Sequence, residues 1–251
     1  MKLLLYTHSD YNWVWKYWHQ QTDKFLNNFE KICLLNSQSM FRDDYLVIKY
    51  NDQNTYKNRI LSCLDRLNDN DVVLFLHEDM FLYNMPKFNI INEYCDLIKN
   101  DKCHTIKLIR AFENLEKSTL HKNLLINPYN QLFSIQPTIL KIKTLKQVYL
   151  SVPGNNIWEF EANTSNKYLK DFISLCSFDE KLDFKRGKFH YDSSIFPYIC
   201  TAVIKGKWNY KEYKKELFEI FYNKKFNHLN YYFSRLNLSK NLILFYLMHY
   251  F

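Results

Sequence analysis

Short apolar runs alternate along the first half of the chain with longer stretches whose apolar residues recur at helical spacing. Short apolar runs predict strands, and helical spacing of apolar and aromatic residues predicts amphipathic helices. The pattern predicts strand, helix, strand, strand and helix over residues 2–7, 12–29, 31–36, 45–52 and 54–71. Asn54 or Thr55 is expected to cap the last of these helices.

The strongest strand signal is VVLFLHEDMFLY at 72–83, whose first five residues are apolar without alternation. That pattern is typical of a central strand covered on both faces. A helix is expected over about 88–99 and another apolar strand over 104–112. Repeated alternation of strands and helices predicts an α/β fold with an open, mainly parallel sheet flanked by helices.

The second half of the chain has a less regular pattern. LLINP at 124–128 and LFSIQPTIL at 132–140 predict a hairpin pair, and 143–152 and 158–173 predict helices. FPYICTAVIKGKWN at 196–209 is expected to form a strand or a turn. No repeat or low-complexity linker interrupts the sequence, so we expect one main folded unit.

Composition narrows the possible classes of protein. The 251 residues are 47% hydrophobic and 24% charged, which is ordinary for a folded globular protein. The three glycines, Gly154, Gly187 and Gly206, cannot form the GxGxxG dinucleotide motif or a phosphate loop of the GxxxxGKS/T type. Rossmann dehydrogenases and P-loop kinases of the standard kind are therefore excluded.

Cysteine spacing and the apolar runs bear on the cellular compartment. The six cysteines are scattered without a CxxC pair, so we expect buried free thiols rather than a zinc or redox site. The first apolar run ends after Tyr6, too early for a signal peptide. No run approaches the 18 or so apolar residues of a membrane span. A cytoplasmic location is expected.

Polar side chains follow the predicted strands at the edge where open α/β sheets bind ligands. They are Thr7 and Ser9 after the first strand, Asn51 and Asp52 after the third, and His77, Glu78 and Asp79 in the strongest strand. Buried carboxylates are costly unless they meet a cation or a donor. Mg²⁺ or Mn²⁺ takes one or two carboxylates together with phosphate oxygens, so we expect such a metal here. The alternative is that Asp79 caps the next segment and His77 packs beneath it.

Several motifs occur in a characteristic order. THSD follows the first strand, YND follows the third, and HED lies at 77–79. LFSIQPTIL, NNIWEFEAN and AVIKGKWN follow in the second half. This series resembles GT-A-type glycosyltransferases, in particular small transferases of bacterial surface-polysaccharide clusters and large DNA viruses. The resemblance covers roughly residues 1–210. His77 replaces the first Asp of the family's DxD motif, which leaves Asp79 as the expected metal ligand.

The resemblance implies a transfer of sugar from a nucleotide-diphosphate donor to a glycan or lipid-linked acceptor, with inversion at the anomeric carbon. Asp79 with the metal, aided by Lys205 and Lys207, would neutralise the departing diphosphate. The catalytic base would come from WEFE, with Glu161 preferred and Glu159 as the alternative. Otherwise both glutamates are first-turn acids that favour a helix start, and the lysines are solvated charges at a turn.

The remaining candidates would contact the two substrates. The nucleotide-sugar set is Thr7, Ser9, Asn51, Asp52, Tyr56, Arg59, His77, Glu78, Arg110, Lys205 and Lys207. Arg110 follows four apolar residues and needs an anion or a carbonyl, which could be Asp79, Glu78 or the donor sugar. Gln136 and Trp158 are candidate acceptor contacts, and Trp158 could equally belong to the core.

The C-terminal segment has its own character. Residues 207–251 hold eight Lys/Arg and three Glu, and basic residues alternate there with aromatic ones. We expect a catalytic unit over 1–209, with a nucleotide half at 1–112 and an acceptor half at 113–209, and a basic helical extension over 210–251. The extension could pack on the sheet, or it could touch an anionic membrane surface that presents a lipid-linked acceptor.

Two other functions remain open. A sugar nucleotidyltransferase has a similar sheet and metal site, but it usually carries a glycine-rich N-terminal signature that this chain lacks. A nucleic-acid-binding module could use the basic aromatic tail. That alternative leaves HED and WEFE unexplained, and we expect nucleic acid not to be a partner.

Overall fold

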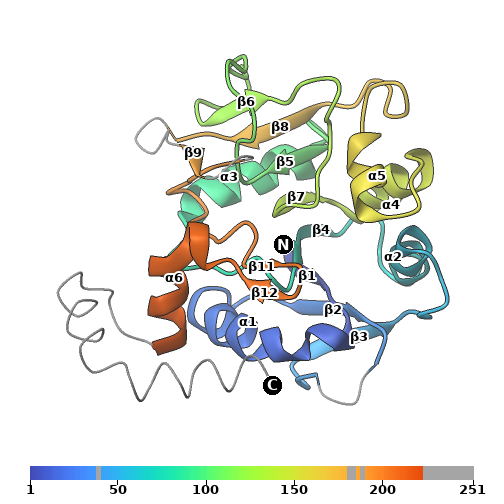
Figure 1. Ribbon diagram of the computed structural model, residues 1–251. Coiled ribbons are helices and arrows are strands. Elements are labelled where there is room, and N and C mark those ends of the chain that lie inside the picture. The colour runs from blue at the N-terminus through green and yellow to red at the C-terminus, as the bar shows by residue number, and fades with distance from the viewer. Residues whose placement is uncertain (38–40, 180–184, 187–189, 223–251) are drawn as a thin grey trace.

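The computed structural model describes residues 1–37, 41–179, 185–186 and 190–222 (Figure 1). The predicted extension is therefore described only from 210 to 222, and its remainder, 223–251, lies outside the described residues. No helix in the described ranges is long and apolar enough to cross a membrane.

The first half of the chain builds the parallel part of the sheet. Its elements are β1 (Lys2–Tyr6), α1 (Asn12–Phe25), β2 (Lys31–Leu35), β3 (Tyr45–Lys49), α2 (Tyr56–Leu64), β4 (Val72–His77) and α3 (Phe88–Lys99), with a short 3-10 turn at Ser9–Tyr11. β1 pairs in parallel with both β2 and β4, and β2 pairs in parallel with β3. The carboxyl ends of these four strands therefore meet at one edge.

The second half extends this sheet and adds two antiparallel strands. Its elements are β5 (Thr105–Lys107), β6 (Leu124–Ile126), β7 (Thr138–Lys141), α4 (Ile142–Ser151), α5 (Ile157–Ala162) and β8 (Ser174–Ser177). Within the described residues, the eight strands have the order β3-β2-β1-β4-β7-β5-β8-β6. Only β7 and β6 run against their neighbours. The predicted α/β class, with a mainly parallel sheet flanked by helices, is confirmed.

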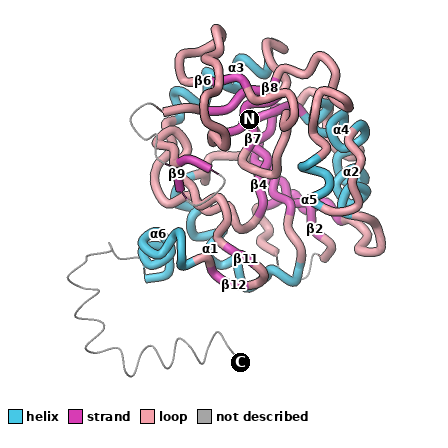
Figure 2. The backbone as a smooth tube through the Cα atoms, turned by 45° about the horizontal axis from the view of Figure 1, so that its top comes forward, coloured by secondary structure: helices cyan, strands magenta, loops and turns pink. Residues whose placement is uncertain are grey.

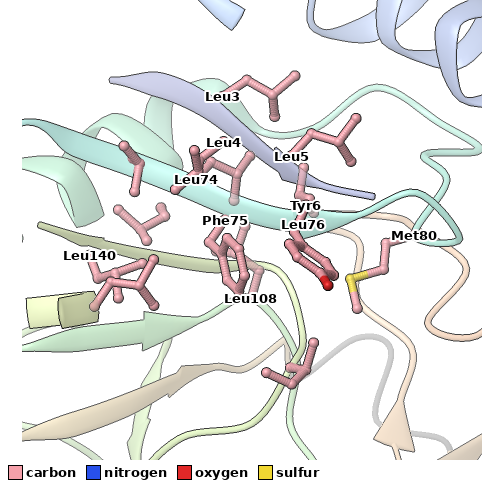
Figure 3. Packing of buried hydrophobic residues seen from close by; sticks show 14 of the residues in the cluster. Leu3, Leu4, Leu5, Tyr6, Leu74, Phe75, Leu76, Met80, Leu108 and Leu140 are labelled. Atoms are coloured by element: carbon pink, nitrogen blue, oxygen red, sulfur yellow. The ribbon is translucent and has the colours of Figure 1, made fainter. Parts of the chain in front are cut away.

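The apolar runs fill the centre of this sheet. The side chains of β1 and β4 pack beside one another, and Leu3, Leu4 and Leu5 are fully buried (Figure 3). Burial of this kind contributes roughly 1.5–3 kcal/mol for each large apolar side chain. All six cysteines are buried free thiols, as expected.

Several predicted elements of the second half are wrong in detail. The runs at 124–128 and 132–140 do not form a hairpin, because β6 pairs with β8 while β7 lies between β4 and β5. The strand predicted over 104–112 ends at Lys107, and the helix predicted over 158–173 ends at Ala162. β8 was not predicted, since its sequence SLCS has neither β-branched residues nor an apolar run.

The β11–β12 hairpin (203–208) and α6 (Tyr210–Tyr222) lie beside α1. Two short hairpins, β9 (Lys185–Arg186) with β10 (His190–Tyr191) and β11 (Val203–Ile204) with β12 (Lys207–Trp208), precede α6 (Tyr210–Tyr222). The Trp208 ring lies 4.8 Å from Trp13 and 4.8 Å from Phe221, so it joins α1, the β11–β12 hairpin and α6 (Figure 2). The beginning of the basic segment therefore packs on the protein.

Candidate functional site

A network of hydrogen bonds joins the carboxyl ends of β1, β2 and β3. We call it the β1–β3 edge, and it consists of His8, Ser9, Asn36, Asp52 and Arg59. Asn36 accepts a hydrogen bond from the Ser9 amide and donates to Ser9 Oγ, both at 2.9 Å. Asn36 also donates to Asp52 Oδ2 at 2.7 Å. One amide side chain therefore holds the loops after β1 and β3 together.

His8 and Arg59 complete the β1–β3 edge around Asp52. His8 Nδ1 accepts a hydrogen bond from the Asp10 amide, which leaves Nε2 to donate to Asp52 Oδ1 at 3.0 Å. Arg59 donates to the Asp52 carbonyl and to the Asn54 carbonyl. Burial alone would raise the pKa of Asp52, but the Asn36 hydrogen bond and the contacts with His8 and Arg59 hold it below its ordinary value.

Aromatic rings line the space between this edge and β4. Tyr6 stacks on Tyr50 at 5.5 Å and meets the edge of Tyr56 at 5.4 Å. The Arg59 guanidinium lies 5.5 Å from the Tyr50 ring. The Tyr56 and Tyr149 hydroxyls form a hydrogen bond at 2.9 Å, which joins α2 to α4 beside these rings.

Two predicted nucleotide contacts are engaged internally. Thr7 is fully buried, accepts a hydrogen bond from Trp15 Nε1 at 2.9 Å and bonds the Glu78 carboxylate. Thr7 therefore interacts with Glu78 inside the protein rather than with solvent. Asn51 is exposed, and its side chain accepts the Gln53 amide in a local turn.

The HED segment ends β4 in a buried position. Glu78 is 7% exposed, and Asp79 is partly exposed. Burial raises the pKa of Glu78, and repulsion from Asp79 adds to the effect. Burial also raises the pKa of Asp79, although the Val203 backbone N–H bonds its carboxylate. Adjacent carboxylates in this position are stabilised by a nearby positive charge.

His77 lies among aromatic rings rather than among charges. Its ring is 5.1 Å from Tyr6, 5.6 Å from Phe75 and 6.4 Å from Tyr56. Burial lowers the pKa of His77 to about 3, so the ring is neutral. Its enclosed Nε2 atom has no hydrogen-bond partner in the described part of the chain.

The β11–β12 hairpin is attached to Asp79. The Ala202 amide donates to the Asp79 carbonyl at 3.1 Å, and the nearby Val203 backbone N–H opposes the rise in the pKa of Asp79. Lys205 and Gly206 form the two-residue turn with φ of 51° and 73°, the left-handed pair that such hairpins require. Exposed Lys205 and Lys207 are therefore presented on a hairpin that Asp79 anchors.

The two glutamates of WEFE have different surroundings. Glu159 is exposed and caps α5, because it bonds the Asn155 amide and exchanges hydrogen bonds with Asn156. Glu161 is partly buried, and one of its oxygens accepts the Ile135 amide. Burial raises the pKa of Glu161, against the opposing effects of that amide and of Lys107. The helix-start alternative thus describes Glu159, whereas Glu161 is the glutamate of the two that is partly buried with a raised pKa.

Three other candidates occupy distinct positions. Gln136 precedes β7 and accepts a hydrogen bond from the Tyr198 hydroxyl at 2.8 Å. Trp158 is 80% exposed, so the alternative that it belongs to the core is wrong. Arg110 lies beyond the end of β5 with its guanidinium 3.8 Å from the Tyr191 ring and 5.4 Å from Phe178.

Sequence reasoning missed two residues of the site, Asn36 and Lys107. Asn36 follows β2 directly, so the rule that identified Ser9 and Asp52 would have found it had the second strand's end been examined. Lys107 is 4% exposed at the end of β5, and its signal was a lone lysine inside the apolar run TIKLI. We call His77, Glu78, Asp79, Lys107 and Glu161 the β4–α5 cluster.

The carboxylates of Glu78 and Asp79 fit a divalent cation whose remaining ligands would come from the substrate. No group of three or more His, Cys, Asp or Glu side chains arranged to hold a metal occurs among the residues that the structure describes. Glu78 and Asp79 offer two neighbouring carboxylates whose burial favours a positive partner. Mg²⁺ binds in this way, through one or two carboxylates and the phosphates of its substrate.

Comparison with known proteins finds similar architecture at low identity. No family model matches the sequence, and no curated protein matches it. The bifunctional IspDF of Campylobacter jejuni is 14% identical with a TM-score of 0.35, over 59% of this chain and 42% of that chain. A UDP-glucose pyrophosphorylase in complex with UDP-glucose is 9% identical with a TM-score of 0.48, over 89% and 82% of the two chains. The galactosyltransferase LgtC with donor and acceptor sugar analogues is 8% identical with a TM-score of 0.41, over 71% and 87%. The chain thus spans less than half of IspDF.

Proposed function

We propose that the chain is a GT-A-type glycosyltransferase that moves a sugar from a nucleotide-diphosphate donor to a glycan or lipid-linked acceptor. One observation carries the proposal. The acidic end of β4 is bonded through Asp79 to a hairpin that presents Lys205 and Lys207. Carboxylates for a cation and flexible ammonium groups for phosphate are the two kinds of group that a departing diphosphate requires.

The β1–β3 edge would receive the nucleoside. Its hydrogen bonds fix the Ser9 and Asp52 side chains before any ligand arrives. A preorganised edge lowers the conformational entropy lost on binding. Asp52 would accept from ribose or base donors, and the ring of Tyr56 lies close enough to β1 to contribute an aromatic wall.

Mn²⁺ or Mg²⁺, when bound, would supply positive charge to the diphosphate as its bond to the sugar breaks. Asp79 would be its first protein ligand and Glu78 the neighbour that adds negative charge. Lys205 and Lys207 would approach the diphosphate from the other side.

Glu161 would act as the general base. The acceptor hydroxyl oxygen forms a bond to the anomeric carbon, the bond from that carbon to the diphosphate breaks, and the hydroxyl proton passes to the Glu161 carboxylate. The nucleoside diphosphate leaves with the bonding electrons. Because the acceptor oxygen attacks the anomeric carbon from the face opposite the leaving diphosphate, the configuration at that carbon is inverted. A carboxylate with a raised pKa is a more effective base near neutral pH than an ordinary one.

A thermal-shift panel tests the donor site. UDP, GDP, CDP and dTDP are each added with and without Mn²⁺ to the wild type and to Asp79→Ala. We expect one nucleotide to raise the melting temperature, Mn²⁺ to increase that shift, and the variant to lose the metal-dependent part. Absence of a shift with all four nucleotides would contradict the proposal.

The released product separates the transferase from a nucleotidyltransferase. A glycosyltransferase releases a nucleoside diphosphate from the nucleotide-sugar donor selected by the panel. A nucleotidyltransferase joins a nucleoside triphosphate to a sugar phosphate and releases pyrophosphate from the triphosphate. The membrane alternative concerns the basic segment 210–251, whose beginning packs on the protein, so binding to anionic vesicles should be compared for the full chain and a chain ending at 222.

A further inference from the structure

Lys107 is a buried cation at the carboxyl end of β5. Its side chain is 4% exposed, and burial lowers its pKa. In the described part of the chain its Nζ forms no ion pair or hydrogen bond, and the contact it makes is with the Phe112 ring, 5.9 Å from the centroid. Its Nζ is not among the fully enclosed unpaired atoms, so the ammonium keeps a small contact with solvent. A largely buried ammonium without a protein acceptor still destabilises a protein, which calls for a compensating role.

The other buried lysines show how unusual this is. Lys31 is 8% exposed and bonds Asp44 at 2.8 Å, and Lys141 is 7% exposed and bonds Asp101 at 2.7 Å. Both lie at element ends where an acid from a neighbouring segment reaches them. Lys107 is as buried as these two residues, and no carboxylate from the described ranges bonds it.

Strand register places Lys107 on the same sheet face as His77. Thr138 of β7 is opposite Lys107 on one side and opposite Phe75 on the other. Residues opposite one another in a sheet point to the same face, and so do residues two apart. Two strand spacings put the Cα atoms of Lys107 and Phe75 about 10 Å apart. Lys107 is therefore beside the proposed reaction centre, on the far side of β7 from HED.

The groups that oppose the effect of burial on the pKa of Lys107 are Cys176 first and the Glu161 carboxylate second, and Lys107 in turn lowers the pKa of Glu161. The Glu161 carboxylate is already engaged by the Ile135 amide. Lys107 is thus within electrostatic range of the proposed base, whereas the diphosphate would lie at Asp79 across β7. The position matches the sugar part of a substrate rather than its diphosphate.

We infer that Lys107 binds an anionic group, a carboxylate or phosphate, on the sugar part of the donor or of the acceptor, and so selects acidic sugars. The inference rests on the proposed function, because that function identifies the neighbouring groups as a sugar-transfer site. Binding would bring an acceptor to the ammonium and would give a charge-assisted hydrogen bond in a site of low polarity. Glu161 would keep its proton-accepting role.

The first experiment measures the ligand-free protein. Lys107→Met keeps the length of the side chain and removes the charge, so we expect its melting temperature to equal or exceed that of the wild type. Lys31→Met is the matched control, and it should melt lower because it removes the ion pairs of Lys31 with Asp44 and Asp23 and leaves Arg42 as the remaining partner of Asp44. A Lys107→Met protein that melts well below the wild type would show that the ammonium has an internal partner, which would overturn the inference.

The second experiment measures selectivity with probes that differ in one charge. In the donor arm, UDP-glucose is compared with UDP-glucuronic acid and GDP-mannose with GDP-mannuronic acid. In the acceptor arm, glucose is compared with glucuronate and with glucose 6-phosphate in the presence of a saturating nucleoside diphosphate. We expect one acidic probe to bind about 10- to 100-fold tighter than its neutral counterpart in the wild type.

Variants then assign that preference to Lys107. Lys107→Met should bind the acidic and neutral probes equally, Lys107→Arg should retain part of the preference, and Lys31→Met should retain all of it. Equal binding in the wild type, or a preference that survives in Lys107→Met, would overturn the inference. Either result with intact nucleotide binding leaves the proposed transferase standing, whereas failure of all four nucleotides to bind contradicts the proposed function.

Discussion

The β1–β3 edge and the β4–α5 cluster lie at the same edge of one sheet, but they differ in how far their polar groups are hydrogen-bonded within the protein. At the β1–β3 edge, Asn36, Asp52 and Arg59 bond one another or nearby backbone. In the β4–α5 cluster, and counting only the described residues as partners, His77 Nε2 is enclosed without a hydrogen bond and Lys107 is buried without an acid bonded to it. The acids Glu78 and Asp79 are next to each other, and burial raises the pKa of both.

This difference indicates that one part of a site can recognise the ligand while another part stabilises charge during the reaction. A surface that only recognises a ligand can be rigid and internally bonded before binding, since recognition requires shape and fixed donors. A centre that stabilises charge during a reaction must keep charges that the free protein does not neutralise. Substitutions at the β1–β3 edge should therefore reduce stability, and substitutions in the β4–α5 cluster should reduce activity.

The largest effect is expected at Glu161. Glu161→Gln keeps an oxygen for the Ile135 amide but cannot accept the acceptor proton, so the transfer rate should fall about 10²- to 10⁴-fold. Stability should change little, because the amide side chain has the same size. The rate is measured as release of nucleoside diphosphate from the donor in the presence of acceptor, and stability by urea unfolding of the same samples.

Glu159→Gln is the matched control for Glu161→Gln. Both variants make the same chemical change on α5 two residues apart, and a glutamine can still cap the Asn155 and Asn156 end of the helix. Its activity should remain within about twofold of the wild type. Equal losses in the two variants would mean that Glu161 is not the base and that charge on α5 acts generally.

A smaller effect, on stability, is expected at Asn36. Asn36→Ala removes the acceptor of the Ser9 amide and the donor to Asp52. Because Asn36 is only partly buried, water can replace some of these bonds, and unfolding should become easier by about 1 kcal/mol. Urea unfolding measures the change, with exposed Asn51→Ala as the control. An unchanged free energy of unfolding would show that the network does not hold the loops.

Asp52 should give the same edge a pH dependence. Its pKa is lower in the folded protein than the roughly 3.9 of an unfolded aspartate, so the folded state binds fewer protons. Its contribution to stability is fully present above about pH 4 and is lost as the pH falls through the lowered value. Asp52→Asn should therefore lose less stability than the wild type between pH 6 and pH 3 in urea unfolding. Parallel losses would contradict the contribution of this carboxylate.

How much the sequence could predict follows from the range of the interactions. Strands β1 to β4 were predicted because their apolar runs are long and each lies between clear polar breaks. β8 is four residues without a strand pattern, and its pairing with β5 is determined by residues almost 70 positions away in the chain. Sequence periodicity contains no information on such a contact.

The site shows the same division. The acids of HED could be found because they interrupt an apolar strand, which is a local signal. Lys107 interrupts a strand in the same way, but the effect of the Glu161 charge on it depends on the position of α5. The difference between Glu159 and Glu161 also depends on the fold, because it is Glu161 that the Ile135 amide contacts from a distant segment.

The smallest effect on stability is expected at Trp158. With 80% of its surface exposed on α5, Trp158→Ala should change the free energy of unfolding by no more than about 0.5 kcal/mol. An exposed tryptophan two positions before Phe160 and three before Glu161 could contact an acceptor with its ring face, so the apparent KM for acceptor should rise while that for donor stays constant. The two values are measured with the nucleotide sugar and the acceptor varied in turn. A rise in both KM values would mean that Trp158 stabilises the position of α5, because a displaced Glu161 affects the reaction of every substrate. No rise in either KM would mean that Trp158 does not contact the acceptor.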